Sequence, residues 1–91
     1  MQYQYKEEVH PIRPNEARVL VTWPGYGWWH QMGEVVTYGD GDVTDIPAGR
    51  IEVWPAHWLH QDVSRLFSSR ADALAWLRDL WEDRQARERA R

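Results

Sequence analysis

Residues 23–29 read Trp-Pro-Gly-Tyr-Gly-Trp-Trp, and this run, the aromatic loop, constrains the fold more than any other segment. Proline and glycine interrupt regular strands and helices, so the run is typical of a surface connection. Such a loop cannot bury three indoles and a phenol unless the rest of the domain folds back over it. Because Trp and Tyr are enriched in binding hot spots, we expect part of the loop to contact a partner.

The chain has 91 residues, which favours a single domain over residues 1–91 with a small core. Such a core needs large side chains, so roughly four or five of the tryptophans are expected to be structural. Cysteine is absent, which excludes a disulfide framework and a thiolate metal site. Residues 1–8 have no apolar stretch typical of a signal peptide, and no segment could span a bilayer. We therefore expect a cytoplasmic protein without a membrane partner.

Charge is unevenly distributed. The net charge is −3, but residues 1–83 carry 7 Lys/Arg against 13 Asp/Glu, a net of −6. Residues 84–91 carry four arginines and one glutamate, a net of +3. An acidic body argues against nucleic-acid binding, which needs a basic footprint, and favours a protein partner with a basic surface. The terminal arginines are expected to complement the dipole of a helix.

Alternation of apolar and polar residues predicts short strands in the first two thirds of the chain. Two tight turns are expected, at Gly39-Asp40-Gly41-Asp42 and at Pro47-Ala48-Gly49, where Pro is placed second and Gly fourth in a type I turn. Connections this short predict an antiparallel meander and exclude a parallel sheet. The expected strands cover residues 3–9, 18–23, 34–38, 43–46 and 50–54.

The last third of the chain changes to a helical period. Apolar residues spaced by three and four from Leu66 to Trp81 predict an amphipathic helix from about residue 70 to 87, with Ser69 as its N-cap. Leu74, Leu77 and Trp81 are expected to face the sheet, which leaves Trp76 exposed. The predicted fold class is α+β: a β-rich part, residues 1–63, as a small antiparallel meander or an SH3-like barrel, with a C-terminal helix, about 69–88, packed on it.

The strand at 18–23, the loop at 24–33, the strand opening at Gly33, the hairpin and the turn at residues 55–59 together resemble an SH3-like barrel over about residues 17–63. This resemblance implies a binding module whose ligands lie against the loop between the first two strands. It places Tyr26, Trp28 and Trp29 in the site, with Trp54 and Trp58 as walls. The appended helix departs from the pattern and would cover one face of the barrel.

Three kinds of site are compatible with the residues. The leading one is a flat protein contact, and its residues are Tyr26, Trp28, Trp29, His30, Trp54 and Trp58. The second is an aromatic cage for a cation, formed by Trp23, Tyr26, Trp28 and Trp29 with Glu34 or Asp45. The third is a zinc or small-ligand site in which His30 joins the His57-x-x-His60 pair.

Enzymatic chemistry is not expected, because the chain has no cysteine nucleophile and no Gly-x-Ser-x-Gly elbow. Asp40, Asp42 and Asp45 do not predict calcium, since Ile51 stands where a bidentate Glu is needed. No cofactor is expected.

The leading hypothesis is a non-enzymatic protein-binding adaptor or inhibitor. Small size and acidity are also typical of phage- or mobile-element-encoded proteins that act on a host or defence complex. A self-associating structural subunit that uses Trp76 is a further alternative, since no pattern sets the oligomeric state.

Overall fold

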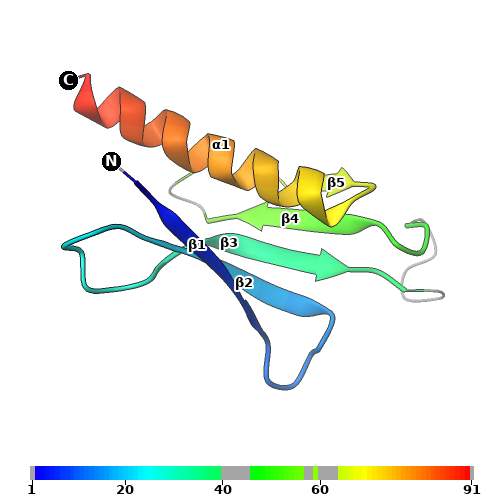
Figure 1. Ribbon diagram of the computed structural model, residues 1–91. Helices are drawn as coiled ribbons and strands as arrows, with labels where there is room; N and C mark the ends of the chain where they lie inside the picture. The colour runs from blue at the N-terminus through cyan, green and yellow to red at the C-terminus, as the bar shows by residue number, and fades with distance from the viewer. Residues whose placement is uncertain (1, 40–45, 57–58, 60–63, 91) are drawn as a thin grey trace.

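The protein is an α+β fold in which one helix lies across an antiparallel sheet, as a computed structural model shows for residues 2–39, 46–56, 59 and 64–90 (Figure 1). The predicted fold class is confirmed. The elements are β1 (Gln4–Val9), β2 (Glu16–Thr22), β3 (His30–Thr37), β4 (Ile51–Pro55), β5 (Arg65–Phe67) and α1 (Arg70–Arg89).

The five strands form a meander in the order β1-β2-β3-β4-β5, with every neighbouring pair antiparallel. The sheet is open, with β1 and β5 at its two edges, so closure into a barrel is not observed in the described part of the chain. β3 pairs directly with β4, Thr37 opposite Ile51. Residues 43–45 of the strand predicted at 43–46 lie outside the described residues, and Ile46 is in a bend.

Two local predictions need correction. Leu66 and Phe67, which the helical pattern included, belong to β5. In the turn before β4, the N–H of Arg50 donates to the carbonyl oxygen of Pro47 at 3.3 Å. This bond places Gly49 third in the turn, where its φ of 83° requires glycine, so Pro47 opens a type II turn rather than taking the second position of a type I turn.

The core lies between the sheet and the helix. Because side chains alternate across a strand, one face of each strand turns toward α1. Cross-strand partners such as Ala17, Val35 and Val53 share that face and are buried. The buried core cluster consists of Ala17, Val19, Val21, Met32, Val35, Ile51, Val53, Ala73, Leu77 and Trp81.

The helix begins as predicted. The hydroxyl of Ser69 accepts a hydrogen bond from the backbone N–H of Asp72 at 3.1 Å, which satisfies one of the free amides of the first turn. Leu77 and Trp81 are buried as expected, while Leu74 is only partly buried.

The prediction that Trp76 is exposed is wrong, because this residue packs at the edge of the core. Its ring centroid lies 5.5 Å from that of Phe67 in β5, and the indole is partly buried against the core cluster. In the described residues, no helix is long and apolar enough to cross a membrane.

Candidate docking surface

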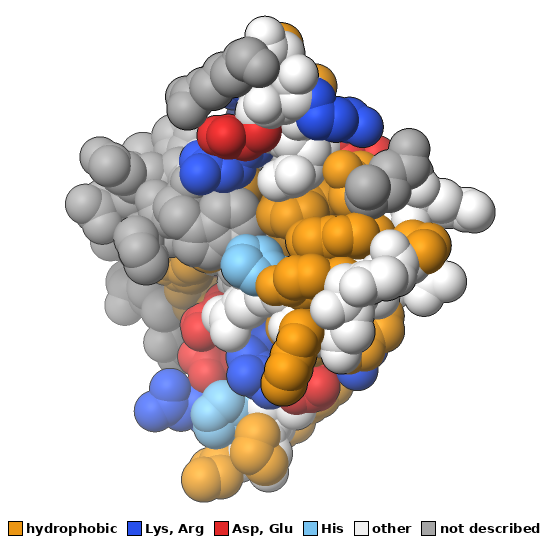
Figure 2. All heavy atoms as spheres, turned by 90° about the vertical axis from the view of Figure 1, so that its left-hand side faces the viewer, with side chains coloured by type: hydrophobic (Ala, Val, Ile, Leu, Met, Phe, Trp, Pro, Cys, Tyr) orange, Lys and Arg blue, Asp and Glu red, His pale blue; other side chains and the backbone are white. Residues whose placement is uncertain are grey.

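The aromatic loop divides into a packed half and an exposed half. In the packed half, the ring of Tyr26 stacks on Trp23 with centroids 4.0 Å apart and an interplanar angle of 18°. Trp23 in turn stacks on Trp81 of the helix at 5.5 Å and 29°. These three rings form the aromatic stack. Figure 2 views this end of the molecule, where hydrophobic side chains gather together.

A tight turn builds the stack. The backbone N–H of Tyr26 donates to the carbonyl oxygen of Trp23 at 3.1 Å. Pro24 stands second in this turn and Gly25 third, with a φ of 88°, which matches a type II turn. The turn reverses the chain over three residues, so the Tyr26 ring is brought over the indole of Trp23.

Tyr3, which immediately precedes β1, packs against the aromatic stack. Its ring meets Trp23 and Trp81 edge-on, with centroid distances of 6.0 Å and 5.7 Å. Aromatic pairs in such geometries contribute about 0.5–1.5 kcal/mol each beyond the area that they bury. Tyr3 and Trp23 therefore pack against the structural core, and Tyr26 is joined to it through its stacking on Trp23.

His30 opens β3 on the same side of the sheet, opposite Val21. Its Nδ1 lies 3.4 Å from the hydroxyl of Tyr26, and its ring centroid lies 5.7 Å from that of Trp81. Burial lowers the pKa of His30, because desolvation disfavours the imidazolium. A shallow hollow of about 340 Å³ adjoins these rings, lined by Trp23, Tyr26, His30, Trp81, Arg84, Gln85 and Glu88.

The exposed half of the loop consists of Trp28 and Trp29, which are 74% and 41% exposed. The hydroxyl of Thr22 donates to the carbonyl oxygen of Trp28 at 2.5 Å, which ties this half to the end of β2. The Nζ of Lys6 lies 4.3 Å from the ring centroid of Trp29, a cation–π contact. The backbone of Trp28 and the ring of Trp29 thus each have a fixed contact, while both indoles are exposed to solvent.

Lys6 belongs to the face of the sheet that α1 does not cover, the helix-free face. Strand register puts Lys6, Leu20 and Gln31 in one row of this face. The next row contains Glu8, Arg18, Glu34 and Trp54.

Trp54 is 46% exposed and lies directly across from Glu34. Three strand spacings separate β1 from β4, so the strand that contains Trp54 lies about 14 Å across the face from the strand that contains Lys6. The helix-free face therefore presents two indoles at opposite sides of a charged centre.

Charged groups in that centre are partly paired. Arg18 forms an ion pair and hydrogen bond with Glu8, and Lys6 lies 3.9 Å from the same carboxylate. Leu20 is only 5% exposed although it points away from the helix, so this part of the face is packed rather than loose. The helix-free face therefore combines exposed indoles with paired charged side chains.

The predicted site residues do not form a single cluster. Tyr26 and His30 lie against Trp81, whereas Trp28 and Trp29 lie in the exposed half of the loop. Of the four rings expected in a cage for a cation, Trp23 and Tyr26 stack on each other and Trp23 also stacks on Trp81, while Trp28 and Trp29 are exposed. Of the predicted residues, Trp58, His57, His60 and Asp45 lie outside the described part of the chain.

The described residues contain no group of three or more His, Asp or Glu side chains that could hold a metal ion. The proposed zinc site includes two of the residues outside that part, so the structure places only His30 of the three. Sequence reasoning missed Lys6 and Arg18, which contribute to the helix-free face. The alternation of side chains along the first strand could have identified Lys6, because it assigns Lys6 to the side of the sheet opposite Tyr5.

Comparison with protein-family models, with curated proteins and with solved structures found no match to this chain. The class is thus defined by architecture alone: an open five-stranded antiparallel sheet with one C-terminal helix.

Proposed function

We propose that this protein is a non-enzymatic protein-binding module, an adaptor or inhibitor, that docks through Trp28 and Trp29 of the aromatic loop and through Trp54 of the helix-free face. The observation that supports this most directly is the division of the loop. One half is anchored by stacking on Trp81, while Trp28 and Trp29 remain 74% and 41% exposed.

Anchoring matters for affinity. Exposed indoles on a mobile loop lose conformational freedom when they bind, and this loss opposes association. Here the loop is fixed by the turn at Tyr26 and by the Thr22–Trp28 hydrogen bond. Large rigid aromatic surfaces of this kind are typical of binding hot spots. The resemblance of residues 17–63 to SH3-like barrels supports the same location, because ligands of that fold lie against the loop between its first two strands, which corresponds here to the loop between β2 and β3.

Charge suggests the chemistry of the partner. Glu34 lies across from the exposed ring of Trp54, which places a carboxylate beside an aromatic face. An arginine or lysine from a partner would gain both an ion pair and a cation–π contact there. The net charge of −6 over residues 1–83 would also steer association with a basic surface.

The test is affinity capture from a native lysate with the wild type, the Trp28→Ala/Trp29→Ala double variant and Ile12→Ala. Ile12 is 82% exposed in the β1–β2 turn, which makes it a matched loss of exposed apolar surface elsewhere. A specific partner should be retained by the wild type and by Ile12→Ala and lost by the double variant. Circular dichroism checks that all three proteins fold.

With the captured partner purified, the double substitution should weaken binding by about 2 kcal/mol or more, roughly thirtyfold in Kd. Trp54→Ala should also weaken binding of the captured partner. A partner that binds the double variant as tightly as the wild type would refute docking through these indoles.

A further inference from the structure

The free edge of β1 offers a second interaction surface. β1 pairs with β2 on one side and stands at the end of the strand order, so its other side has no neighbouring strand in the described part of the chain. In Figure 1, β1 crosses in front of β2 and β3, and α1 lies along β4 and β5. Unpaired edges of this kind are templates for pairing with another strand.

One hydrogen bond identifies which backbone groups face outward. The N–H of His10 donates to the carbonyl oxygen of Glu16 at 2.9 Å, so position 10 forms a hydrogen-bonded pair with β2. Such pairs alternate along an antiparallel ladder. Positions 4, 6 and 8 therefore also bond to β2, and the N–H and C=O groups of Tyr5, Glu7 and Val9 point to the free edge.

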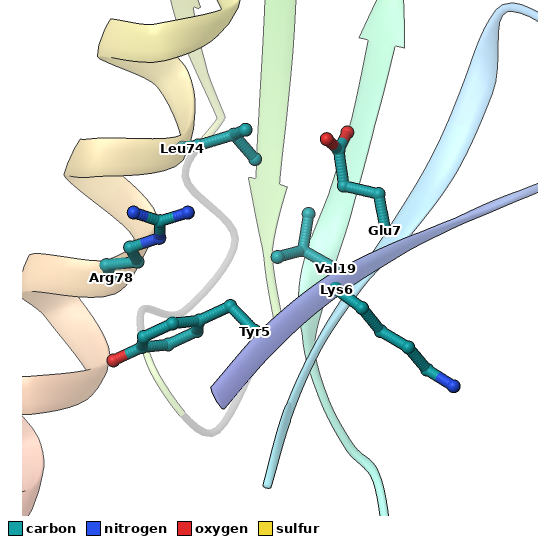
Figure 3. A pocket seen from close by; sticks show the side chains of 6 residues that line it. All are labelled: Tyr5, Lys6, Glu7, Val19, Leu74 and Arg78. Carbon is teal, nitrogen blue, oxygen red and sulfur yellow. The ribbon is translucent and has the colours of Figure 1, made fainter. Parts of the chain in front are cut away.

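Side chains alternate in the same way. Figure 3 shows the side chain of Tyr5 directed toward Arg78 of the helix, while Lys6 points to the other side of the strand. Glu8 shares the helix-free face with Lys6, and Val9 shares the other face with Tyr5. Val9 is 60% exposed, although its cross-strand partner Ala17 is buried.

We propose that β1 pairs antiparallel with β1 of a second copy of this chain, about a twofold axis at Glu7. In this register Tyr5 lies opposite Val9 of the second copy, and both residues use their outward backbone groups. An aromatic residue opposite a β-branched one is a favourable cross-strand pair. The pairing would cover the exposed side chain of Val9.

Charge complementarity selects this register. It sets Lys6 opposite Glu8 of the second copy and Glu8 opposite its Lys6, in non-hydrogen-bonded positions where side chains approach most closely. Two symmetric ion pairs result. The two Glu7 carboxylates meet at the axis, and each already has an ion pair with Arg70 of its own helix, which offsets their repulsion.

Charged residues usually protect an edge strand against pairing. Here Lys6 and Glu8 of one copy are complementary in charge to Glu8 and Lys6 of another. The same charges therefore favour pairing with a second copy of β1 and disfavour pairing with an uncharged strand. In the described part of the chain, the helix backbone lies against β3, β4 and β5, and the side chains of Arg70 and Arg78 reach over β1. The edge is therefore accessible to an added strand.

The twofold axis would stand perpendicular to the continuous sheet, so both helix-free faces would point to the same side. The two sets of Trp28, Trp29 and Trp54 could then engage one partner surface together, with the gain in avidity that linked sites provide. Dimerisation does not require the proposed docking function, since its surface is the strand edge alone.

The test is the mass of the full chain across concentration, measured by sedimentation equilibrium, for the wild type, Lys6→Glu and Glu8→Lys. Each substitution turns two cross-strand ion pairs into like-charge pairs, so each should weaken dimerisation about tenfold or more. An equimolar mixture of the two variants should restore dimers, because the strand with two acidic side chains then faces the strand with two basic ones. Arg13→Glu makes the same charge change as Lys6→Glu in the β1–β2 turn and should dimerise like the wild type.

Glu8→Lys also removes the ion pair with Arg18, and circular dichroism checks its fold. The double variant Lys6→Glu/Glu8→Lys keeps the composition of the strand and exchanges the signs, so it should dimerise again. In hydrogen exchange, the amides of Glu7 and Val9 should be slowed in the dimer and fast in Lys6→Glu. A wild type that stays monomeric into the millimolar range, or a dimer that the single substitutions do not weaken, would overturn the proposal.

Discussion

Tyr26 stacks on Trp23 with ring centroids 4.0 Å apart, and this contact separates the packed half of the aromatic loop from the exposed half. Through Trp23 the stack continues to Trp81, a helical residue that is 2% exposed. The loop is thereby joined to the core at one end. Trp28 and Trp29 follow within three residues and remain exposed, so a single short loop contains both an anchor and a presented surface.

This division predicts that two Trp→Ala substitutions in the same loop will change the free energy of unfolding by very different amounts. Trp23→Ala removes the central ring of the stack and should lower the free energy of unfolding by about 3 kcal/mol. Trp28→Ala removes a ring that is 74% exposed and should change it by no more than about 0.5 kcal/mol. Urea denaturation monitored by circular dichroism measures the free energy of unfolding of both variants. Equal losses in the two variants would mean that Trp28 also belongs to the core.

The fold class was predictable because its main signals are local. Val19 and Val21, two positions apart, lie on one face of β2, and the Ser69 cap starts the helix as its spacing indicates. Such patterns depend only on residues a few positions apart, so they can be recognised from the sequence without knowledge of the tertiary structure. Short antiparallel connections then leave few topologies.

Other features depend on contacts between distant segments. Trp23 and Trp28 stand in the same loop, and only the position of Trp81, far along the chain, determines which of them is packed. β5 has three residues, too few to show a period of two, so Leu66 and Phe67 joined the helical pattern. Leu20 is buried on the helix-free face, which alternation alone does not explain.

Tyr5→Phe is predicted to stabilise the protein. The Tyr5 hydroxyl is buried without a hydrogen-bond partner in the described part of the chain. Removing an unsatisfied buried hydroxyl should raise the free energy of unfolding by about 1 kcal/mol, and the ring can keep its contact with Arg78. Tyr38→Phe is the matched control with the opposite sign, because the Tyr38 hydroxyl donates to Glu52 at 2.6 Å.

The same substitution should alter the alkaline limb of the stability curve. Burial, followed by the nearby Glu82 carboxylate, raises the pKa of Tyr5 to about 12 from its usual 10.0. The folded state therefore favours the neutral phenol, and its contribution is present below pH 10 and lost as the pH rises toward 12. Tyr5→Phe should show a shallower decline across this interval in urea titrations. An unchanged slope would contradict the desolvated position of the hydroxyl.

His30 predicts a pH dependence on the acidic side. Because burial lowers its pKa from 6.5, the unfolded chain takes up the proton first as the pH falls. Its contribution to stability is thus complete above pH 6.5 and declines below it. Tyr26, Arg84 and Glu88 line the same hollow as His30.

Urea denaturation between pH 7.5 and 5.5 measures this dependence. His30→Gln should lose less stability than the wild type over that interval, because it lacks the imidazole whose protonation opposes folding. Equal slopes for the wild type and His30→Gln would show that the imidazole titrates as freely in the folded protein as in the unfolded chain.

Gly33 links the stability of the sheet to the position of Trp54. A Cβ at residue 33 would lie 2.6 Å from the carbonyl oxygen of Trp54 and 3.0 Å from the Cα of Pro55, both backbone atoms of β4. A Gly→Ala change in an unstrained strand normally stabilises by about 0.4–1 kcal/mol, because it restricts the unfolded chain. Here β4 must shift instead, so Gly33→Ala should destabilise by about 2 kcal/mol. It should also move the NMR signal of the Trp54 indole N–H, while Gln31→Ala on the same strand should not; a more stable Gly33→Ala would show that β3 and β4 are not in this close contact.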